Sequence, residues 1–193
     1  FAFQGVKLRL GPGRLLPGKE VAPAPPPPPG PFAPLEARRD YLDHLRKSAQ
    51  GLALKRGVVY LDAMGGAGGG ILGQVLKRLE APVELRELHP LPHPLFYGVA
   101  PDPRPEHLRT LRLLLREAKP PALGLALDGD ADRLGVYLPG GEALPGDQAL
   151  ARLREAAQGR EVEALGEGAY RFPWHLEEPD PFLAALLLMG VLL

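Results

Sequence analysis

The chain of 193 residues has no cysteine and no asparagine, and it has a single serine, Ser48, and a single threonine, Thr110. The lack of cysteine excludes disulfides, thiol catalysis and cysteine-ligated metal sites within these residues. The 23 basic and 23 acidic side chains give a net charge of zero, without the basic surplus of a dedicated nucleic-acid binder. The longest apolar run, 182–193, falls short of the roughly 20 residues needed to cross a bilayer. We expect a cytoplasmic protein with no nucleic-acid or membrane partner.

Glycine and proline are abundant, with 24 of each, yet 45% of the residues are hydrophobic, which is enough to form a core. Residues 1–34 begin with an expected short strand at 6–10, followed by Gly/Pro-rich sequence that includes five consecutive prolines at 25–29. Because proline fixes φ and lacks an N–H donor, we expect this segment to be a semi-rigid linker.

Residues 35–142 alternate between helix-like and strand-like patterns. Apolar residues near the 3.6-residue period predict helices at 35–54, 71–79 and 106–118, and compact apolar runs predict strands at 57–62, 82–88 and 122–127. Short connections between alternating elements favour a parallel or mixed sheet flanked by helices. The predicted fold class is therefore α/β, with a further helix at 145–158 and an apolar helix from Phe182.

Three acidic residues follow the last predicted strand directly. Asp128, Asp130 and Asp132 alternate with Gly129 and Ala131, the two smallest residues. In an extended backbone, side chains at i, i+2 and i+4 lie on one side, so the three carboxylates are expected to converge. Such close charges repel unless a cation lies among them, and ligands that are all oxygen favour magnesium. The triad therefore predicts a Mg²⁺ site at the carboxyl end of the sheet.

Other interpretations of this acidic motif exist. An EF-hand loop needs glycine and glutamate where this chain has Arg133 and Pro139, so that interpretation fails. A haloacid-dehalogenase-type phosphatase also places two aspartates after an apolar strand, but it has threonine or valine at the position of Asp132. A solvated acidic turn without a ligand is the structural alternative.

The motif and several other segments resemble the α-D-phosphohexomutases, the phosphoglucomutase/phosphomannomutase family. Asp-Gly-Asp-Ala-Asp-Arg at 128–133 resembles the metal loop of that family. The other similar segments, in chain order, are 3–7, 58–62 with Gly65, Gly66 and Gly68, 96–103, 166–167 and 180–185. The similarity is strong over 57–142 and weaker at both ends.

The resemblance implies a mutase that interconverts hexose 1-phosphate and 6-phosphate of mannose or glucose through a phosphoserine and a bisphosphate intermediate. It implies Mg²⁺ on Asp128, Asp130 and Asp132, a catalytic and substrate-binding Arg133, a catalytic Lys7 and a substrate-binding Glu167. The corresponding domains are 1–34, the end of a phosphoserine domain plus linker; 35–142, the metal-binding domain; and 143–193, a partial sugar-recognition domain.

The chain also departs from the family pattern. A Ser-His-Asn-Pro-like loop should precede the segment that matches 1–10, and Ser48 lies in helical sequence without that context. The sugar loop lacks the usual serine, because it contains Gly168-Ala169-Tyr170 after Glu167. We therefore expect these residues to be part of a longer protein. A non-catalytic phosphosugar- or metal-binding relic and a Mg²⁺-dependent sugar phosphatase remain alternatives, and the oligomeric state is not predicted.

Three weaker candidates complete the set. The glycine loop at 65–70 joins a strand to a helix, so it favours either phosphate binding or close packing. His89 and His93 lie among prolines and are either metal ligands or ordinary exposed histidines. Trp174 and His175 are expected to pack or to face solvent rather than to bind sugar.

Overall fold

The computed structural model describes residues 37–193. The domain predicted at 1–34, with its strand at 6–10, the proline run and Lys7, lies outside the described residues.

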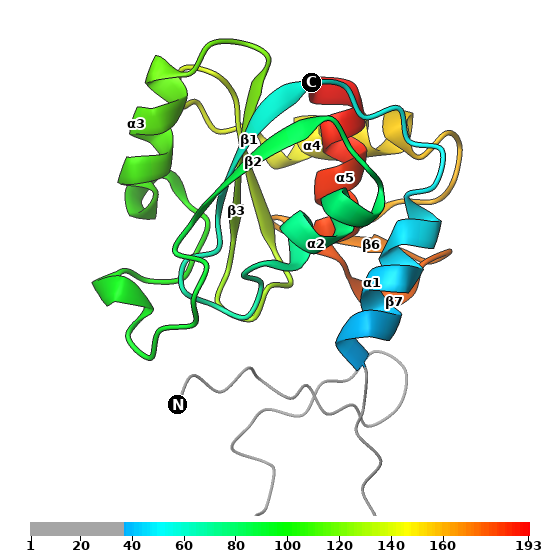
Figure 1. Cartoon of the computed structure of the whole chain (residues 1–193), viewed down its shortest axis with the longest axis horizontal. Helices are drawn as coiled ribbons and strands as arrows, with labels where there is room; N and C mark the ends of the chain where they lie inside the picture. The colour runs from blue at the N-terminus through cyan, green and yellow to red at the C-terminus, as the bar shows by residue number, and fades with distance from the viewer. Residues whose placement is uncertain (1–36) are drawn as a thin grey trace, which may run out of the picture.

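A four-stranded mixed sheet forms the centre of the fold (Figure 1). Its strands are β1 (Gly57–Asp62), β2 (Val83–Leu88), β3 (Ala122–Leu127) and β4 (Leu134–Tyr137), in the order β2-β1-β3-β4. β1 pairs in parallel with both β2 and β3, whereas β4 runs antiparallel to β3. The structure thus confirms the predicted α/β fold class and the three predicted strands, which run parallel to one another. β4 was not predicted, because its four residues follow the acidic loop without a break in the sequence pattern.

Helices cover both faces of this sheet (Figure 1). α3 (Arg109–Glu117) lies on one face, and α2 (Ile71–Arg78), α4 (Gly146–Ala156) and α5 (Pro181–Leu192) lie on the other, where α1 (Ala37–Ser48) packs against α2 and α5. The strands divide their side chains between these layers with the two-residue period of a β-strand. Val59 and Leu61 face the larger cluster, and Tyr60 faces the cluster under α3.

The predicted helices are present but shorter. α1 ends at Ser48, and Gly51 has a φ of 86° in the turn that follows. The helix predicted at 106–118 divides into a 3-10 turn, η3 (Pro105–His107), and α3, because Leu108 has a non-helical backbone with φ −113° and ψ 39°. A second 3-10 turn, η2 (Phe96–Gly98), lies in the long loop between β2 and α3.

The last quarter of the chain contains a small antiparallel sheet that was not predicted. β5 (Glu163–Gly166), β6 (Ala169–Phe172) and β7 (Leu176–Pro179) pair in the order β5-β6-β7. Each strand has only four residues, and two register shifts interrupt the ladder. Such short and irregular strands leave little alternation for sequence analysis to detect.

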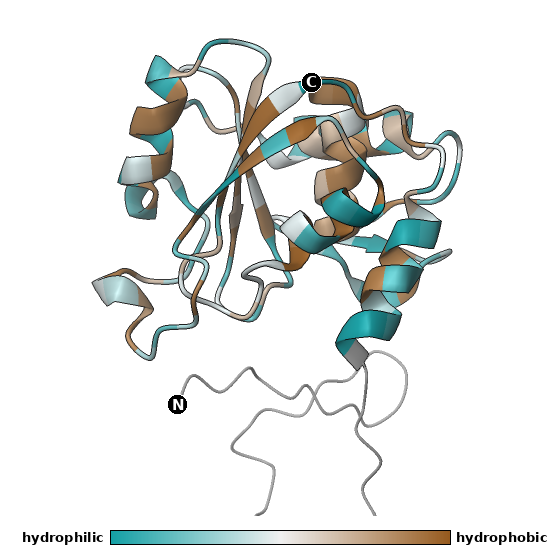
Figure 2. Cartoon of the chain, in the orientation of Figure 1, coloured by the Kyte–Doolittle hydropathy of each residue, from teal (hydrophilic) through white to brown (hydrophobic). Residues whose placement is uncertain are grey.

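α5 is the most apolar helix of the described chain and confirms the apolar helix predicted from Phe182 (Figure 2). All of its residues from Pro181 to Met189 are buried, against β3, β4, β6, α1 and α4. A helix that is apolar all round belongs in the interior of a protein. One hydrophobic core therefore joins residues on both sides of position 142, and the domain boundary predicted there stays a prediction. No helix in residues 37–193 is long and apolar enough to cross a membrane.

A buried polar network fixes the start of α5. Asp180 Oδ1 accepts hydrogen bonds from the backbone N–H groups of Phe182 and Leu183, both at 2.9 Å, and thereby caps the helix. Asp180 Oδ2 accepts from the Tyr41 hydroxyl at 2.9 Å and lies 2.8 Å from His175 Nε2. The pKa of Tyr41 is raised, mainly because the hydroxyl is buried and to a smaller extent because of the negative charge of Asp180.

Replacing Asp180 by alanine is expected to lower the free energy of unfolding by about 3 kcal/mol, because both the helix cap and the partner of two buried polar groups are lost. Urea denaturation measures the change. Asp147→Ala, in the exposed first turn of α4, is the control and should cost less than about 1 kcal/mol. Equal losses in the two variants would contradict the assigned role.

Candidate metal and phosphate site

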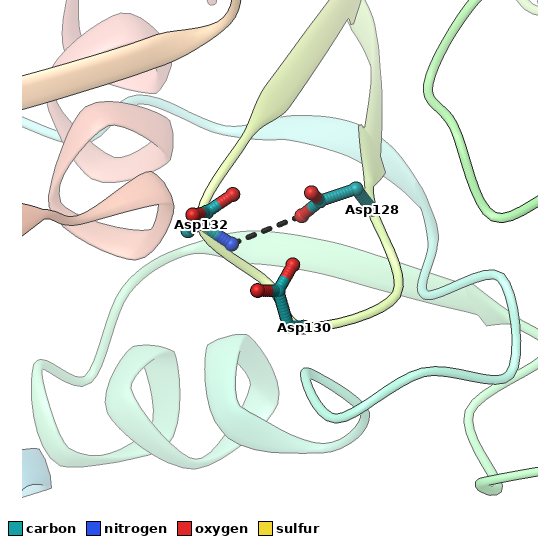
Figure 3. Close-up of side chains that lie close together, drawn as sticks. All are labelled: Asp128, Asp130 and Asp132. Atoms are coloured by element: carbon teal, nitrogen blue, oxygen red, sulfur yellow. Dashed lines mark hydrogen bonds between the residues drawn. The ribbon is translucent and has the colours of Figure 1, made fainter. Parts of the chain in front are cut away.

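The three predicted metal ligands converge in the structure. Asp128, Asp130 and Asp132 each offer a carboxylate oxygen, and the three oxygens lie within 4.8 Å of one another (Figure 3). Asp128 is buried, Asp132 is half-buried and Asp130 is exposed. Within residues 37–193 this is the only group of three or more acidic, histidine or cysteine side chains that is close enough to hold a metal ion.

A turn brings these carboxylates together, not the extended backbone assumed from the sequence. The Ala131 N–H donates to the Asp128 carbonyl at 3.2 Å, and Ala131 has a φ of 57°. Asp128 Oδ1 accepts the N–H groups of Asp132 at 2.9 Å and Arg133 at 3.1 Å, so one buried carboxylate organises the whole loop. The predicted convergence is confirmed, but its geometric cause is different.

The glycine loop packs directly under the acidic loop. The Ala67 N–H donates to the Gly129 carbonyl at 3.0 Å, and a Cβ at Gly66 would lie 2.5 Å from the same oxygen. A Cβ at Gly68 would lie 2.4 Å from a Leu127 methyl carbon. Of the two interpretations left open for this loop, the structure supports close packing, because the glycines allow two backbones to touch.

Arg133 joins the acidic loop to a second carboxylate. Its Nε donates to Asp128 Oδ2 at 2.9 Å, and its Nη1 donates to Asp102 Oδ1 at 3.3 Å. Arg104 Nε donates to the other oxygen of Asp102 at 2.6 Å, and this hydrogen bond lowers the pKa of Asp102. Two acidic groups therefore hold the guanidinium of Arg133 beside the triad.

A pocket next to the triad brings Arg133 and Glu167 together. Asp102, Arg104, Tyr137 and Tyr170 line the same pocket. The turn between β5 and β6 is docked there because the Leu134 N–H donates to the Gly168 carbonyl at 2.9 Å. The two predicted substrate-binding residues, 34 positions apart in the sequence, thus share one cavity beside the proposed metal ligands.

Asp102 and Arg104 were missed by the sequence analysis. They lie in the proline-rich segment 101–105, where neither spacing nor periodicity distinguishes a functional charge from a solvated one. Asp102 belongs to the 96–103 segment that resembles the phosphohexomutases, so the resemblance was the one signal that pointed to its neighbourhood. Lys7, the remaining predicted catalytic residue, lies outside the described residues.

Ser48 belongs to a different polar cluster. Its Oγ lies 2.7 Å from His175 Nδ1, and His175 Nε2 contacts Asp180, so the three side chains have the contacts of a Ser-His-Asp triad. His175 is fully enclosed and stacks on His44 with ring centroids 4.5 Å apart. Ser48 ends helix α1, where the negative end of the helix dipole would repel a developing oxyanion. The cluster therefore acts as an internal brace, as expected for a packed His175.

Neither of the two weaker histidine candidates belongs to a metal centre within the described residues. His89 Nδ1 contacts Asp62 Oδ1 at 2.9 Å, and His93 Nδ1 accepts the N–H groups of Leu95 and Tyr97, both at 3.2 Å. Both histidines contact Tyr97 through their rings. They therefore organise the loop between β2 and α3.

Comparison with known proteins places this chain in a family. Residues 39–141, just over half of the chain, match the family described as phosphoglucomutase/phosphomannomutase, alpha/beta/alpha domain II. The chain therefore belongs to the phosphoglucomutase/phosphomannomutase family, the α-D-phosphohexomutases.

Individual relatives show the same pattern. A phosphoglucomutase from Neisseria gonorrhoeae is 37% identical over 112 residues, which cover 57% of this chain and 23% of that protein. The crystal structure of a Thermus thermophilus protein described as a phosphomannomutase has a TM-score of 0.69 and 30% identity, over 82% of this chain and 47% of its own. A Burkholderia thailandensis phosphoglucomutase/phosphomannomutase family protein, at 20% identity and a TM-score of 0.63, shows the shared fold over 80% of this chain and 43% of its own. The chain thus spans less than half the length of these relatives.

Replacing Gly66 by alanine is expected to lower the free energy of unfolding by about 1 to 3 kcal/mol, because the new methyl group must displace the Gly129 backbone. Gly190→Ala in α5 is the matched control, since no atom lies within 4 Å of its Cβ position. Urea denaturation of both variants measures the difference. A Gly66→Ala protein as stable as the control would show that the two loops are not in close contact.

The stability of the metal-free chain is expected to depend on pH through Asp128. Burial raises the pKa of this carboxyl from its usual value to about 6. Because the folded-state pKa lies above the unfolded value, the native state binds the proton more tightly, and stability falls as the pH rises from about 4 to about 6. In EDTA, the wild type should therefore lose more stability than Asp128→Asn over this range, by about 1 to 2 kcal/mol once solvent screening is allowed for. Parallel stability curves for the two proteins would contradict the assignment.

Proposed function

We propose that the acidic loop holds Mg²⁺ for phosphoryl transfer in a phosphohexomutase that interconverts the 1- and 6-phosphates of mannose or glucose. The observation that carries this proposal is the convergence of Asp128, Asp130 and Asp132 within 4.8 Å at the carboxyl end of β3. Hard oxygen ligands of this kind fit magnesium. When bound, the ion supplies neutralising charge for the oxygens of a phosphoryl group.

The surrounding residues have complementary roles in this proposal. Arg133 presents a guanidinium that suits phosphate or sugar oxygens, and Asp102 and Asp128 fix its position. Glu167 accepts hydrogen bonds from sugar hydroxyl groups in the same pocket. Lys7 supplies a proton or a positive charge. A phosphoserine on sequence outside these 193 residues supplies the phosphoryl group, since Ser48 is committed to His175.

Two alternatives to the mutase would treat a hexose phosphate differently. A magnesium-dependent sugar phosphatase releases inorganic phosphate from hexose phosphates without a bisphosphate activator. A non-catalytic relic binds the metal or the sugar phosphate and turns nothing over. Membership of the phosphoglucomutase/phosphomannomutase family favours the mutase. Arg133 and Glu167 in one pocket provide for the phosphate and the hydroxyl groups of a hexose phosphate in all three cases.

Replacing Asp130 by asparagine is expected to weaken Mg²⁺ binding to the 193-residue chain at least tenfold, because one of three anionic ligands is lost. Isothermal titration calorimetry measures the affinity. Urea denaturation should give an unchanged free energy of unfolding, because Asp130 is exposed. Asp147→Asn removes an exposed acidic group from α4 and should leave Mg²⁺ affinity unchanged. Equal affinities in the two variants would remove the triad as the metal site.

An activity assay of the intact protein distinguishes the three proposed functions. With glucose 1-phosphate, glucose 1,6-bisphosphate and Mg²⁺, a mutase forms glucose 6-phosphate, and Asp130→Asn abolishes this turnover. Release of inorganic phosphate in place of glucose 6-phosphate would favour the phosphatase. Binding of the sugar phosphate with neither product would favour the relic.

A further inference from the structure

A second pocket lies at the same edge of the sheet, between the carboxyl end of β1 and the start of α3. The long loop between β2 and α3, at the lower left of Figure 1, forms part of its wall. The polar residues that line it are Asp62, His89, Tyr97, His107, Arg109 and Thr110. None of them lines the pocket that contains Arg133 and Glu167. The two pockets are separated by the segment 102–107, which contributes Asp102 to one and His107 to the other.

Asp62 is the most unusual group in this second pocket, because its side chain is only 4% exposed. Its Oδ1 accepts hydrogen bonds from the Met64 N–H and from His89 Nδ1, both at 2.9 Å. In the part of the chain that the structure describes, no group donates to Oδ2. Buried carboxylate oxygens are normally hydrogen-bonded to protein or to water, so this oxygen is open to a donor from water or from a bound molecule.

The two histidines of the pocket present further acceptors. His89 Nδ1 donates to the Asp62 carboxylate, and His107 Nδ1 donates to the Asp102 carbonyl at 3.1 Å. A neutral imidazole that carries its proton on Nδ1 has an acceptor at Nε2. Asp62 Oδ2 and the two Nε2 atoms are therefore three acceptors, which suit the hydroxyl groups of a polyol.

Hydrogen-bond donors, one of them positively charged, lie at the start of α3. Among residues 37–193, neither the Arg109 guanidinium nor the Thr110 hydroxyl has a side-chain partner. A guanidinium and a hydroxyl group are suited to phosphate oxygens, and the first N–H groups of a helix add positive potential.

We propose that this pocket is a second binding site, for a monosaccharide phosphate. The hydroxyl groups of the ligand bind Asp62, His89 and His107, and its phosphate binds Arg109 and Thr110. The two sites would therefore bind their ligands through different side chains. Within residues 37–193 only Asp128, Asp130 and Asp132 form a group of three potential metal ligands, so the side chains of the second pocket do not point to a metal ion.

The test is isothermal titration calorimetry, in which glucose 6-phosphate is added to the 193-residue chain in the presence of EDTA. Arg109→Ala should weaken binding at least tenfold, and Thr110→Val should weaken it severalfold. Arg116→Ala removes an exposed arginine from the last turn of the same helix and should bind like the wild type. Glucose 6-phosphate can also bind beside Arg133 in the proposed mutase site, so all these titrations use the Arg133→Ala protein in place of the wild type, which leaves the second pocket to bind the ligand. Failure of the mutase proposal then leaves this test unchanged.

Glucose and inorganic phosphate are the comparison ligands, and each should bind at least tenfold more weakly than glucose 6-phosphate. The proposal is overturned if Arg109→Ala binds like the wild type. It is overturned equally if the Arg133→Ala protein, with its fold intact, does not bind glucose 6-phosphate at all, since the ligand then binds only beside the triad. If inorganic phosphate binds as tightly as glucose 6-phosphate, the pocket is a general anion site and the proposed specificity for a sugar phosphate is wrong. Urea denaturation of each variant keeps loss of binding distinct from loss of fold.

Discussion

The candidate site depends on the buried carboxylate of Asp128. This side chain follows the most enclosed strand of the sheet, and its two oxygens accept two backbone N–H groups and the Arg133 guanidinium. Burial makes the charged form costly and raises the pKa of Asp128 to about 6. The hydrogen bonds offset part of this cost. They also set the turn that brings Asp130 and Asp132 to the same point.

The same carboxylate connects the site to the rest of the fold. Asp128 fixes Arg133, Arg133 reaches Asp102, and Asp102 lies in the segment whose Pro101 carbonyl accepts the Gly129 N–H at 3.1 Å. The glycine loop supports the turn from below, since Gly66 lets the backbone contact Gly129. A change in any of these loops therefore moves the carboxylates of the triad. This interdependence explains why a loop rich in glycine and alanine keeps a defined shape.

α5 supports the candidate site from the core, because it packs against β3 and β4, the strands on either side of the acidic loop. Its apolar surface is buried against β3 and β4, and Asp180 anchors its first turn through the polar cluster with Tyr41 and His175. The small sheet β5-β6-β7 leads into this helix and carries Glu167 to the pocket with Arg133. Residues after position 142 thus complete the site that the earlier residues begin. The Ser48–His175–Asp180 contacts show that triad-like distances alone do not make a catalytic centre.

The sequence by itself determined the α/β class, the three parallel strands, the apolar last helix and the acidic triad, because periodic burial and a carboxylate cluster after an apolar strand are local patterns. It also carried the resemblance to the phosphohexomutases, which the comparisons confirm. Only the tertiary structure decided that a turn assembles the triad, that Asp102 holds Arg133, and that Glu167 lies beside it. Only the fold showed Asp62 in a second pocket with one oxygen that accepts no hydrogen bond from residues 37–193. These facts depend on contacts between segments far apart in the chain, and no local pattern encodes which distant backbone a buried carboxylate will meet.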